Sequence, residues 1–182
     1  MAISDQALMT SYESVTSVAR LIEATGSPVV TSLIQANSGT TLAQQRALFM
    51  TLAQQGRRPL WLALGGAWTG LDLNGAHAQP PMLSDTDNLL TDLVIPRIPF
   101  SLNVTTTHMH RMTARGGVPW ELLDTTMRFK QGIGRLVRRE GIPNNRRIFV
   151  LDGRLNDEQF SNYLFPLRQL MDLYPQKTWT AE

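Results

Sequence analysis

Three short apolar runs, separated by segments with helical spacing, constrain the fold of this chain more than any other feature. The runs cover residues 7–9, 29–34 and 59–64. Between them, apolar residues recur at helical spacing over residues 15–26 and 42–53. Strands that are apolar on both faces and alternate with helices indicate a parallel sheet with helices on both faces. We therefore predict an α/β domain with a mainly parallel sheet.

The second half of the chain continues this alternation less regularly. The expected elements are a loop over residues 74–91, strands over 93–95 and 147–151, and helices over 120–139 and 158–173. Pro166 should kink the last helix or end it early. Residues 101–117 show no clear pattern. Because 182 residues is about the length of one domain, we expect a single domain over residues 1–182.

Composition excludes several kinds of site and of protein. The chain has no cysteine, which excludes disulfides, thiolate zinc sites and iron–sulfur clusters within it. No apolar run approaches the roughly 18 residues of a membrane helix, and the first twenty residues lack the pattern of a secretory leader. We expect a cytoplasmic protein with no membrane partner.

Residues 127–139 separate polar from apolar side chains at helical spacing. At about 100° per residue, Gln131, Arg135 and Arg138 fall on one face of a helix. An amide and two guanidiniums in this order resemble a set of donors for phosphate oxygens. Gly132 and Gly134 flank that face, which suggests a close approach to the backbone. A solvated basic helix is the alternative that periodicity alone leaves open.

Basic residues are concentrated around this stretch. Residues 128–147 contain Arg128, Lys130, Arg135, Arg138, Arg139, Arg146 and Arg147, against the single acid Glu140. A local basic patch indicates phosphate, from a nucleotide or a nucleic acid, more readily than a membrane surface.

A glycine-rich turn follows the third apolar run and carries Trp68, Gly70 and Asp72. Ligands of open α/β sheets bind at the carboxyl ends of strands, so this turn is a candidate site, with a plain turn as the alternative. The chain has no phosphate loop of the form G-x-x-x-x-G-K-[ST]. The pair His108 and His110 matches no metal-ligand spacing, and we expect it in a solvent loop.

Five segments, in order, resemble superfamily 2 helicases of the DinG and XPD branch. Residues 131–138 (QGIGRLVR) are similar to motif VI, residues 66–75 (GAWTGLDLNG) to motif V, and residues 8–13 (LMTSYE) to motif IV. Residues 98–100 (IPF) match the Leu-Pro-Phe after motif V, and residues 149–154 (FVLDGR) the strand and Asp-x-Arg after motif VI. Ala67 and Thr69 depart from the family's Phe and Glu.

The resemblance implies a second RecA-like lobe, of the P-loop NTPase type, in an ATP-dependent helicase. It implies that the N-terminal lobe holds most of ATP and Mg²⁺ through a phosphate loop and an Asp-Glu-x-His box. Arg138 is then the arginine finger, Arg135 its partner, and Gln131 couples the nucleotide to lobe closure. Gly70, Asp72, Gly132 and Gly134 are expected near the nucleotide. Such a lobe is expected to be inactive alone.

The resemblance also implies a track for single-stranded DNA and 5′→3′ movement. Ser11 and Tyr12 are candidates for phosphate contacts, and Trp68 for base stacking, with core packing as the alternative for Trp68. The loose motif V match points to a divergent member, such as the CRISPR-associated DinG proteins of type IV systems, with a CRISPR ribonucleoprotein complex as a partner. The rival interpretation is a non-catalytic module that binds nucleic acid or protein on a RecA-like scaffold.

Overall fold

The computed structural model describes residues 5–26, 32–37, 39–73, 89–100, 106–114, 118–136 and 146–177. Its strands are β1 (Asp5–Leu8), β2 (Ser32–Gln35), β3 (Pro59–Ala63), β4 (Asp92–Ile95) and β5 (Arg147–Val150). Its helices are α1 (Tyr12–Thr25), α2 (Leu42–Gln54), α3 (Thr106–Ala114), α4 (Val118–Ile133) and α5 (Phe165–Met171). Short 3-10 helices are η1 (Gly65–Trp68), η3 (Gly153–Leu155) and η4 (Glu158–Phe160).

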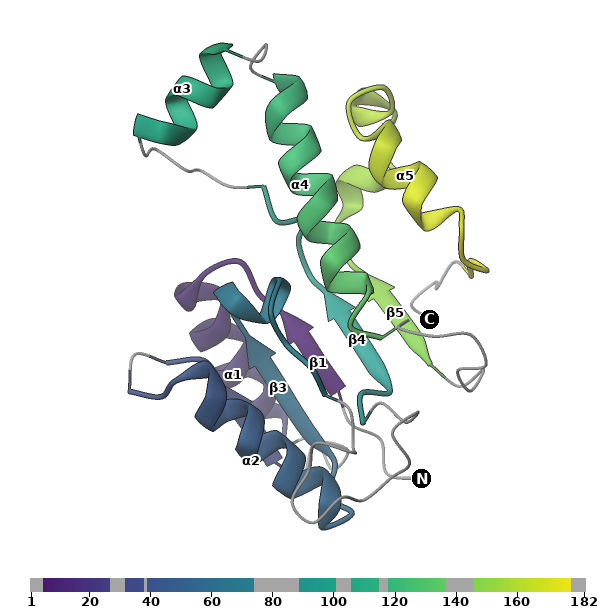
Figure 1. Cartoon of the computed structure of the whole chain (residues 1–182). Helices are drawn as coiled ribbons and strands as arrows, with labels where there is room; N and C mark the ends of the chain where they lie inside the picture. Colours follow the sequence, from purple (N-terminus) through teal and green to yellow (C-terminus); the bar gives the residue numbers. More distant parts are fainter. Residues whose placement is uncertain are drawn as a thin grey trace. The chain divides into compact units, whose positions relative to one another are not determined.

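The five strands form one sheet in the order β2-β3-β1-β4-β5, and every neighbouring pair is parallel. All arrowheads that are visible in Figure 1 accordingly point to the same edge. The central strand β1 pairs Ala7 with Leu62 of β3 and with Val94 of β4. This arrangement confirms the predicted α/β fold with a parallel sheet. The turns that follow the strands therefore lie along one edge.

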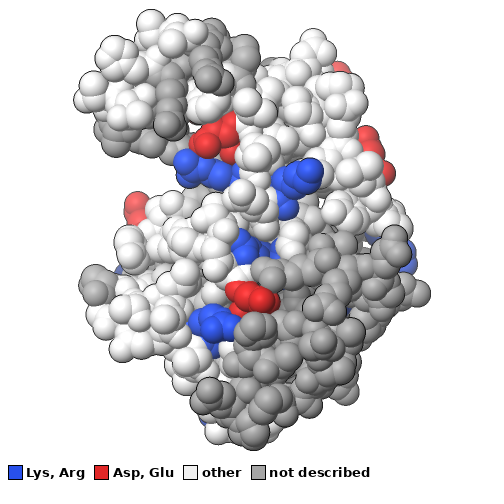
Figure 2. Space-filling view, in the orientation of Figure 1, with Lys and Arg blue, Asp and Glu red and all other residues white. Residues whose placement is uncertain are grey.

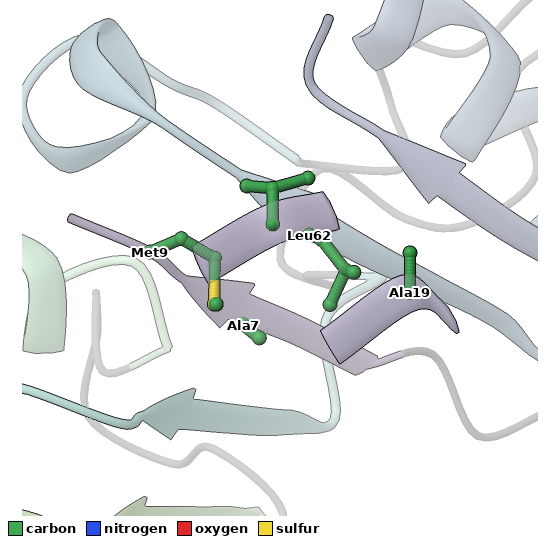
Figure 3. Packing of buried hydrophobic residues seen from close by; sticks show 5 residues of the cluster. Ala7, Met9, Ala19 and Leu62 are labelled. Atoms are coloured by element: carbon green, nitrogen blue, oxygen red, sulfur yellow. The ribbon is translucent and has the colours of Figure 1, made fainter. Parts of the chain in front are cut away.

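Helices cover both faces of the sheet, as the apolar runs predicted. On one face, Val15 and Ala19 of α1 pack on Ala7, Met9 and Leu62 in a buried cluster, part of which Figure 3 shows. On the other face, α2 packs on Trp61, which precedes Leu62 and so points the opposite way. The rings of Phe49 and Trp61 lie 5.7 Å apart, and the Trp61 indole N–H donates to Gln45 Oε1 at 3.0 Å.

Glycines with positive φ follow the first two helices. Gly26 follows α1 in the left-handed region, with φ of 57°. Gly56 follows α2 with φ of 70°. Both values are strained for residues with a Cβ, which explains glycine at these positions. At its start, α2 has a capping box in which Thr41 and Gln44 satisfy each other's backbone N–H groups.

Three expectations about the helices need correction. Residues 106–114 of the unpatterned segment form α3, which includes His110 and Met109, so this part is helix and not a solvent loop. The side chains described in α3 are exposed, so it offered no apolar stripe to find. The long helix α4 ends at Ile133, before Arg139, and residues 134–136 form a turn. Pro166 lies in the first turn of α5, where no N–H is required, rather than kinking a longer helix.

The chain divides into two compact units. The sheet unit comprises Met1–Ile98 and Gln131–Leu151, and the helical unit comprises Pro99–Lys130 and Asp152–Glu182. The sheet, α1, α2 and the end of α4 belong to the sheet unit, while α3, most of α4 and α5 belong to the helical unit. The described residues of the segments that resemble motifs IV, V and VI all lie in the sheet unit.

Candidate nucleotide and nucleic-acid site

The carboxyl edge of the parallel sheet brings the candidate residues together. Ser11 and Tyr12 follow β1, and the turn that holds Trp68 and Asp72 follows β3. Because β1 and β3 are adjacent and parallel, their turns are neighbours at the edge where ligands of such sheets bind.

Trp68 connects the three motif-like segments of the sheet unit. Its indole N–H donates to the carbonyl oxygen of Met9 at 2.9 Å, which joins motif V to motif IV. Its ring lies against Gly132 of motif VI. The side chain is 5% exposed, which favours the core-packing alternative over base stacking. Trp68 therefore holds the edge together from inside.

Gly132 leaves room for this packing. A Cβ at position 132 would lie 3.0 Å from Cε3 and Cζ3 of Trp68 and 3.1 Å from Cδ1 of Leu8. These distances are shorter than ordinary carbon–carbon contacts. The group that approaches the Gly132 backbone closely is thus an indole ring and a leucine of the same unit, and a ligand is not needed to explain the glycine.

Arg135 does not lie on an exposed helical face as predicted. Because α4 ends at Ile133, Arg135 falls in the following turn, where it is 7% exposed. Its Nη1 donates a hydrogen bond to the carbonyl oxygen of Leu71, next to Asp72. Gln131 is exposed in the last turn of α4, and Gly134 is in the turn itself. Arg138 lies outside the described residues.

The Asp72 loop is held from two sides. The backbone N–H of Gly70 donates to the carbonyl of Gly66 at 2.8 Å, which closes the turn after η1. Arg46 of α2 donates from Nε to the carbonyl oxygen of Asp72 at 2.6 Å. Sequence reasoning missed Arg46 as a site residue. The sequence signal that could have identified it is its place among the apolar residues that recur at helical spacing, such as Leu42 and Phe49. A charged side chain on such a helix face needs a partner.

Ser11 and Tyr12 lie at the start of α1. The Ser11 hydroxyl accepts from the backbone N–H of Ser14 at 3.1 Å and so caps the helix. Tyr12 is 61% exposed. The exposed tyrosine and the hydroxyl at a helix N-terminus match the chemistry of phosphate and base contacts.

The described basic residues around motif VI differ in their surroundings. Arg128 pairs with Asp124 at 2.9 Å, and Arg135 is buried. Arg147 lies at the start of β5, at the amino edge of the sheet, where it pairs with Asp92. On the face that Figure 2 shows, the described basic side chains are interrupted by acidic and uncharged ones. Arg138 and Arg139 lie outside the described residues, so the predicted local basic patch stays a prediction.

The amino edge of the sheet carries an ionic cluster. Arg147 donates from Nε and Nη2 to the two carboxylate oxygens of Asp92, both at 2.7 Å. Burial, followed by the charge and hydrogen bonding of Asp92, raises the pKa of Asp5 to about 6, while Arg147 and Arg58 oppose the shift. This cluster lies at the edge opposite to the candidate site, so we interpret it as structural.

The helical unit brings the other two matched segments together. Arg154 donates to both carboxylate oxygens of the buried Asp152, at 2.9 and 2.5 Å. Its guanidinium carbon lies 5.0 Å from the centre of the Phe100 ring, which stacks on Tyr163. The IPF segment and the Asp-x-Arg segment thus form one contact of charge and aromatic ring.

No three His, Cys, Asp or Glu side chains in the described ranges gather into a group that could hold a metal ion. No helix in the part of the chain that the structure describes is long and apolar enough to cross a membrane.

Comparison with known proteins gives one family. No curated protein sequence matches the chain. The family profile of the helicase C-terminal domain matches residues 6–167, a span that includes the segments that resemble motifs IV, V and VI. With its parallel α/β sheet and these segments at one edge, the chain belongs to the helicase C-terminal domain family of the DinG and XPD type.

Proposed function

We propose that residues 1–182 act as the second motor lobe of an ATP-dependent DNA helicase. The observation that carries this proposal is Trp68, which contacts Met9 of motif IV and Gly132 of motif VI at the carboxyl edge of the sheet. A fixed edge of this kind can face a first lobe that carries the phosphate loop. The family membership supports an ATP-dependent helicase as the parent activity.

The proposed catalytic group is the motif VI set. Arg138 acts as the arginine finger that stabilises negative charge on the γ-phosphate in the transition state. Arg135 is its partner beside the Asp72 loop, to which it is hydrogen-bonded. Gln131, which is exposed, couples the nucleotide to lobe closure.

The donor chemistry of this edge fits one side of an ATP site. Guanidiniums and an amide suit phosphate oxygens. Gly70, Asp72 and Gly134 are the proposed neighbours of the nucleotide, and Gly132 contributes by packing against Trp68. The first lobe is proposed to hold most of ATP and Mg²⁺. When bound, ATP would supply the phosphoryl group that is transferred, and Mg²⁺ would supply positive charge beside it. With no cysteine in the chain, no iron–sulfur cluster is held by thiolates here.

The proposed single-stranded DNA track runs past the start of α1. Ser11 and Tyr12 contact the strand directly, because both are exposed. Trp68 acts on it indirectly, since its indole is buried beneath the same edge. Movement of this lobe against the first during each ATP cycle then drives the strand, with 5′→3′ polarity. The family match does not separate the CRISPR-associated DinG proteins from other members.

The test compares ATP hydrolysis by the chain alone and by the assembled helicase, in which it is joined to a lobe with a phosphate loop. We expect no hydrolysis from the chain alone and DNA-stimulated hydrolysis from the assembly. Robust DNA-stimulated hydrolysis by the chain alone would overturn the proposal. An assembly that binds DNA without hydrolysing ATP would instead support the rival, a non-catalytic binding module.

A further inference from the structure

Arg46 of α2 is the residue that the helicase motifs leave unassigned at this edge. It lies 46 positions into the chain, on a helix outside motifs IV, V and VI, yet its Nε is 2.6 Å from the carbonyl oxygen of Asp72. Arg135 of motif VI binds the preceding carbonyl, that of Leu71. We propose that Arg46 is a positioning residue that, together with Arg135, sets the direction of the Asp72 side chain.

Arg135 and Arg46 bind the carbonyl groups on either side of the Asp72 Cα. The Leu71 carbonyl belongs to the peptide plane before the Asp72 Cα, and the Asp72 carbonyl belongs to the plane after it. Peptide units are planar, so a hydrogen bond to a carbonyl oxygen restrains the orientation of the whole unit. Restraints on both units narrow the range of φ and ψ at Asp72. They therefore narrow the range of directions of its Cα–Cβ bond.

Packing of the neighbouring leucines supports the same conclusion. Leu71 is 2% exposed and Leu73 is 3% exposed, while Asp72 between them is half-buried. The two leucines hold the loop from the core side, and the two arginines hold its carbonyls. Asp72 is thus the one residue of these three that is not fully buried.

Arg46 has a rigid base from which to act. The capping box of Thr41 and Gln44 fixes the first turn of α2, and Phe49 packs on Trp61 one turn later. A half-buried guanidinium is costly without a partner, so the short bond to a main-chain carbonyl accounts for the charge at this position. The backbone conformation at Asp72 also depends on motif VI, because Arg135 binds the carbonyl of the first of the two peptide units.

The consequence for function rests on the proposed role of this edge in ATP hydrolysis. If Asp72 takes part in ATP hydrolysis in the cleft between the two lobes, the direction of its side chain determines how much it contributes to the rate. A displacement of about 1 Å can change a rate by about 100-fold. The structural part of the proposal does not depend on that role, and it can be measured on the 182-residue chain alone.

The first measurement is hydrogen exchange at the amides of residues 70–73 in the chain. Arg46→Met keeps the length of the side chain and removes its donors. We expect exchange in this segment to rise about tenfold, with exchange in β1 unchanged. Arg20→Met, an exposed arginine on α1, is the matched control and should change nothing. Unchanged exchange at residues 70–73 in Arg46→Met would overturn the positioning role.

The second measurement is kcat for ATP hydrolysis by the assembled helicase. We expect Arg46→Met to lower kcat about 10- to 100-fold, and Arg46→Lys, which retains one donor, to lose less than Arg46→Met. In an Asp72→Asn background, Arg46→Met should change kcat less than about twofold, because both variants act through the same group. Equal losses in both backgrounds would overturn the proposal. If Arg46→Met does not fold, Arg46→Lys with and without Asp72→Asn gives the same comparison.

Failure of the proposed function has a different signature. In that case Arg138→Ala would leave kcat unchanged, whereas the exchange result for Arg46→Met would still hold. The two experiments therefore separate the positioning of Asp72 from its use in catalysis.

Discussion

The indole N–H of Trp68 donates a hydrogen bond to the carbonyl oxygen of Met9, with 2.9 Å between Nε1 and O. Both residues are buried, with Met9 at 3% and Trp68 at 5% exposure. The bond joins the turn after β3 to the end of β1. The ring of Trp68 also lies against the backbone of Gly132. The three motif-like segments thus share one core contact, and their geometry depends on its stability.

Trp68→Phe removes that hydrogen bond and part of the ring. The Met9 carbonyl loses its partner in a buried site and a small cavity forms, so we expect a loss of about 2 kcal/mol in the free energy of unfolding. Urea denaturation followed by circular dichroism measures it. Tyr12→Phe, at an exposed aromatic residue, is the control and should change stability by less than about 0.5 kcal/mol. Equal stabilities for the two variants would contradict the role of Trp68.

Gly132→Ala tests the contact from the other side. Alanine favours a helix by about 1 kcal/mol over glycine, but its Cβ would meet Trp68 at 3.0 Å and Leu8 at 3.1 Å. Since both neighbours are buried, we expect the steric cost of the added Cβ to exceed the gain in helix propensity. The free energy of unfolding should then fall by about 1–2 kcal/mol.

The control for this variant is Gly153→Ala, because a Cβ at Gly153 meets nothing within 4 Å. Its denaturation midpoint should stay at the wild-type value. A more stable Gly132→Ala variant would mean that Trp68 can move aside, and that the three segments are joined loosely.

The parallel sheet could be predicted because its signal is local. Runs such as residues 59–64 are apolar on both faces, and this pattern is typical of buried parallel strands. Gly26 ends the first predicted helical segment, and it has the positive φ that glycine tolerates best. The strand order β2-β3-β1-β4-β5 could not be predicted in this way, because the alternation indicates parallel strands but not which strands are neighbours.

The geometry of motif VI could not be predicted because it depends on tertiary contacts. Helical spacing continues through Leu136, yet α4 ends at Ile133 and Arg135 turns inward to the Leu71 carbonyl. The reason for Gly132 is the ring of Trp68, which is 64 positions away in the sequence. Neither contact leaves a periodic pattern. Arg46 was missed for the same reason.

Asp5 at the amino edge of the sheet makes stability depend on pH. Burial and Asp92 raise the pKa of Asp5 from 3.8 to about 6. The folded state therefore binds a proton more tightly than the unfolded state between these values, so this residue's contribution to stability falls as pH rises from about 4 to about 6. Asp5→Asn removes the charge, and we expect it to stabilise the chain at pH 8 by about 1 kcal/mol, after allowance for solvent screening.

Thermal unfolding of Asp5→Asn and the wild type at pH 4 and pH 8 measures this effect. The melting temperature of the variant should exceed that of the wild type at pH 8 and approach it at pH 4, where Asp5 is already largely protonated in the folded state. The same difference at both pH values would show that Asp5 acts through something other than its charge.

The central claim is that this lobe supplies an arginine finger to ATP hydrolysis, and one measurement tests it most directly. It is kcat for DNA-stimulated hydrolysis by the assembled helicase, compared between Arg138→Ala and the matched neighbour Arg139→Ala. We expect Arg138→Ala to lower kcat by about 10³ to 10⁵ without changing the melting temperature, and Arg139→Ala to lower kcat by less than about tenfold. A folded Arg138→Ala variant that hydrolyses ATP at the wild-type rate would contradict the account.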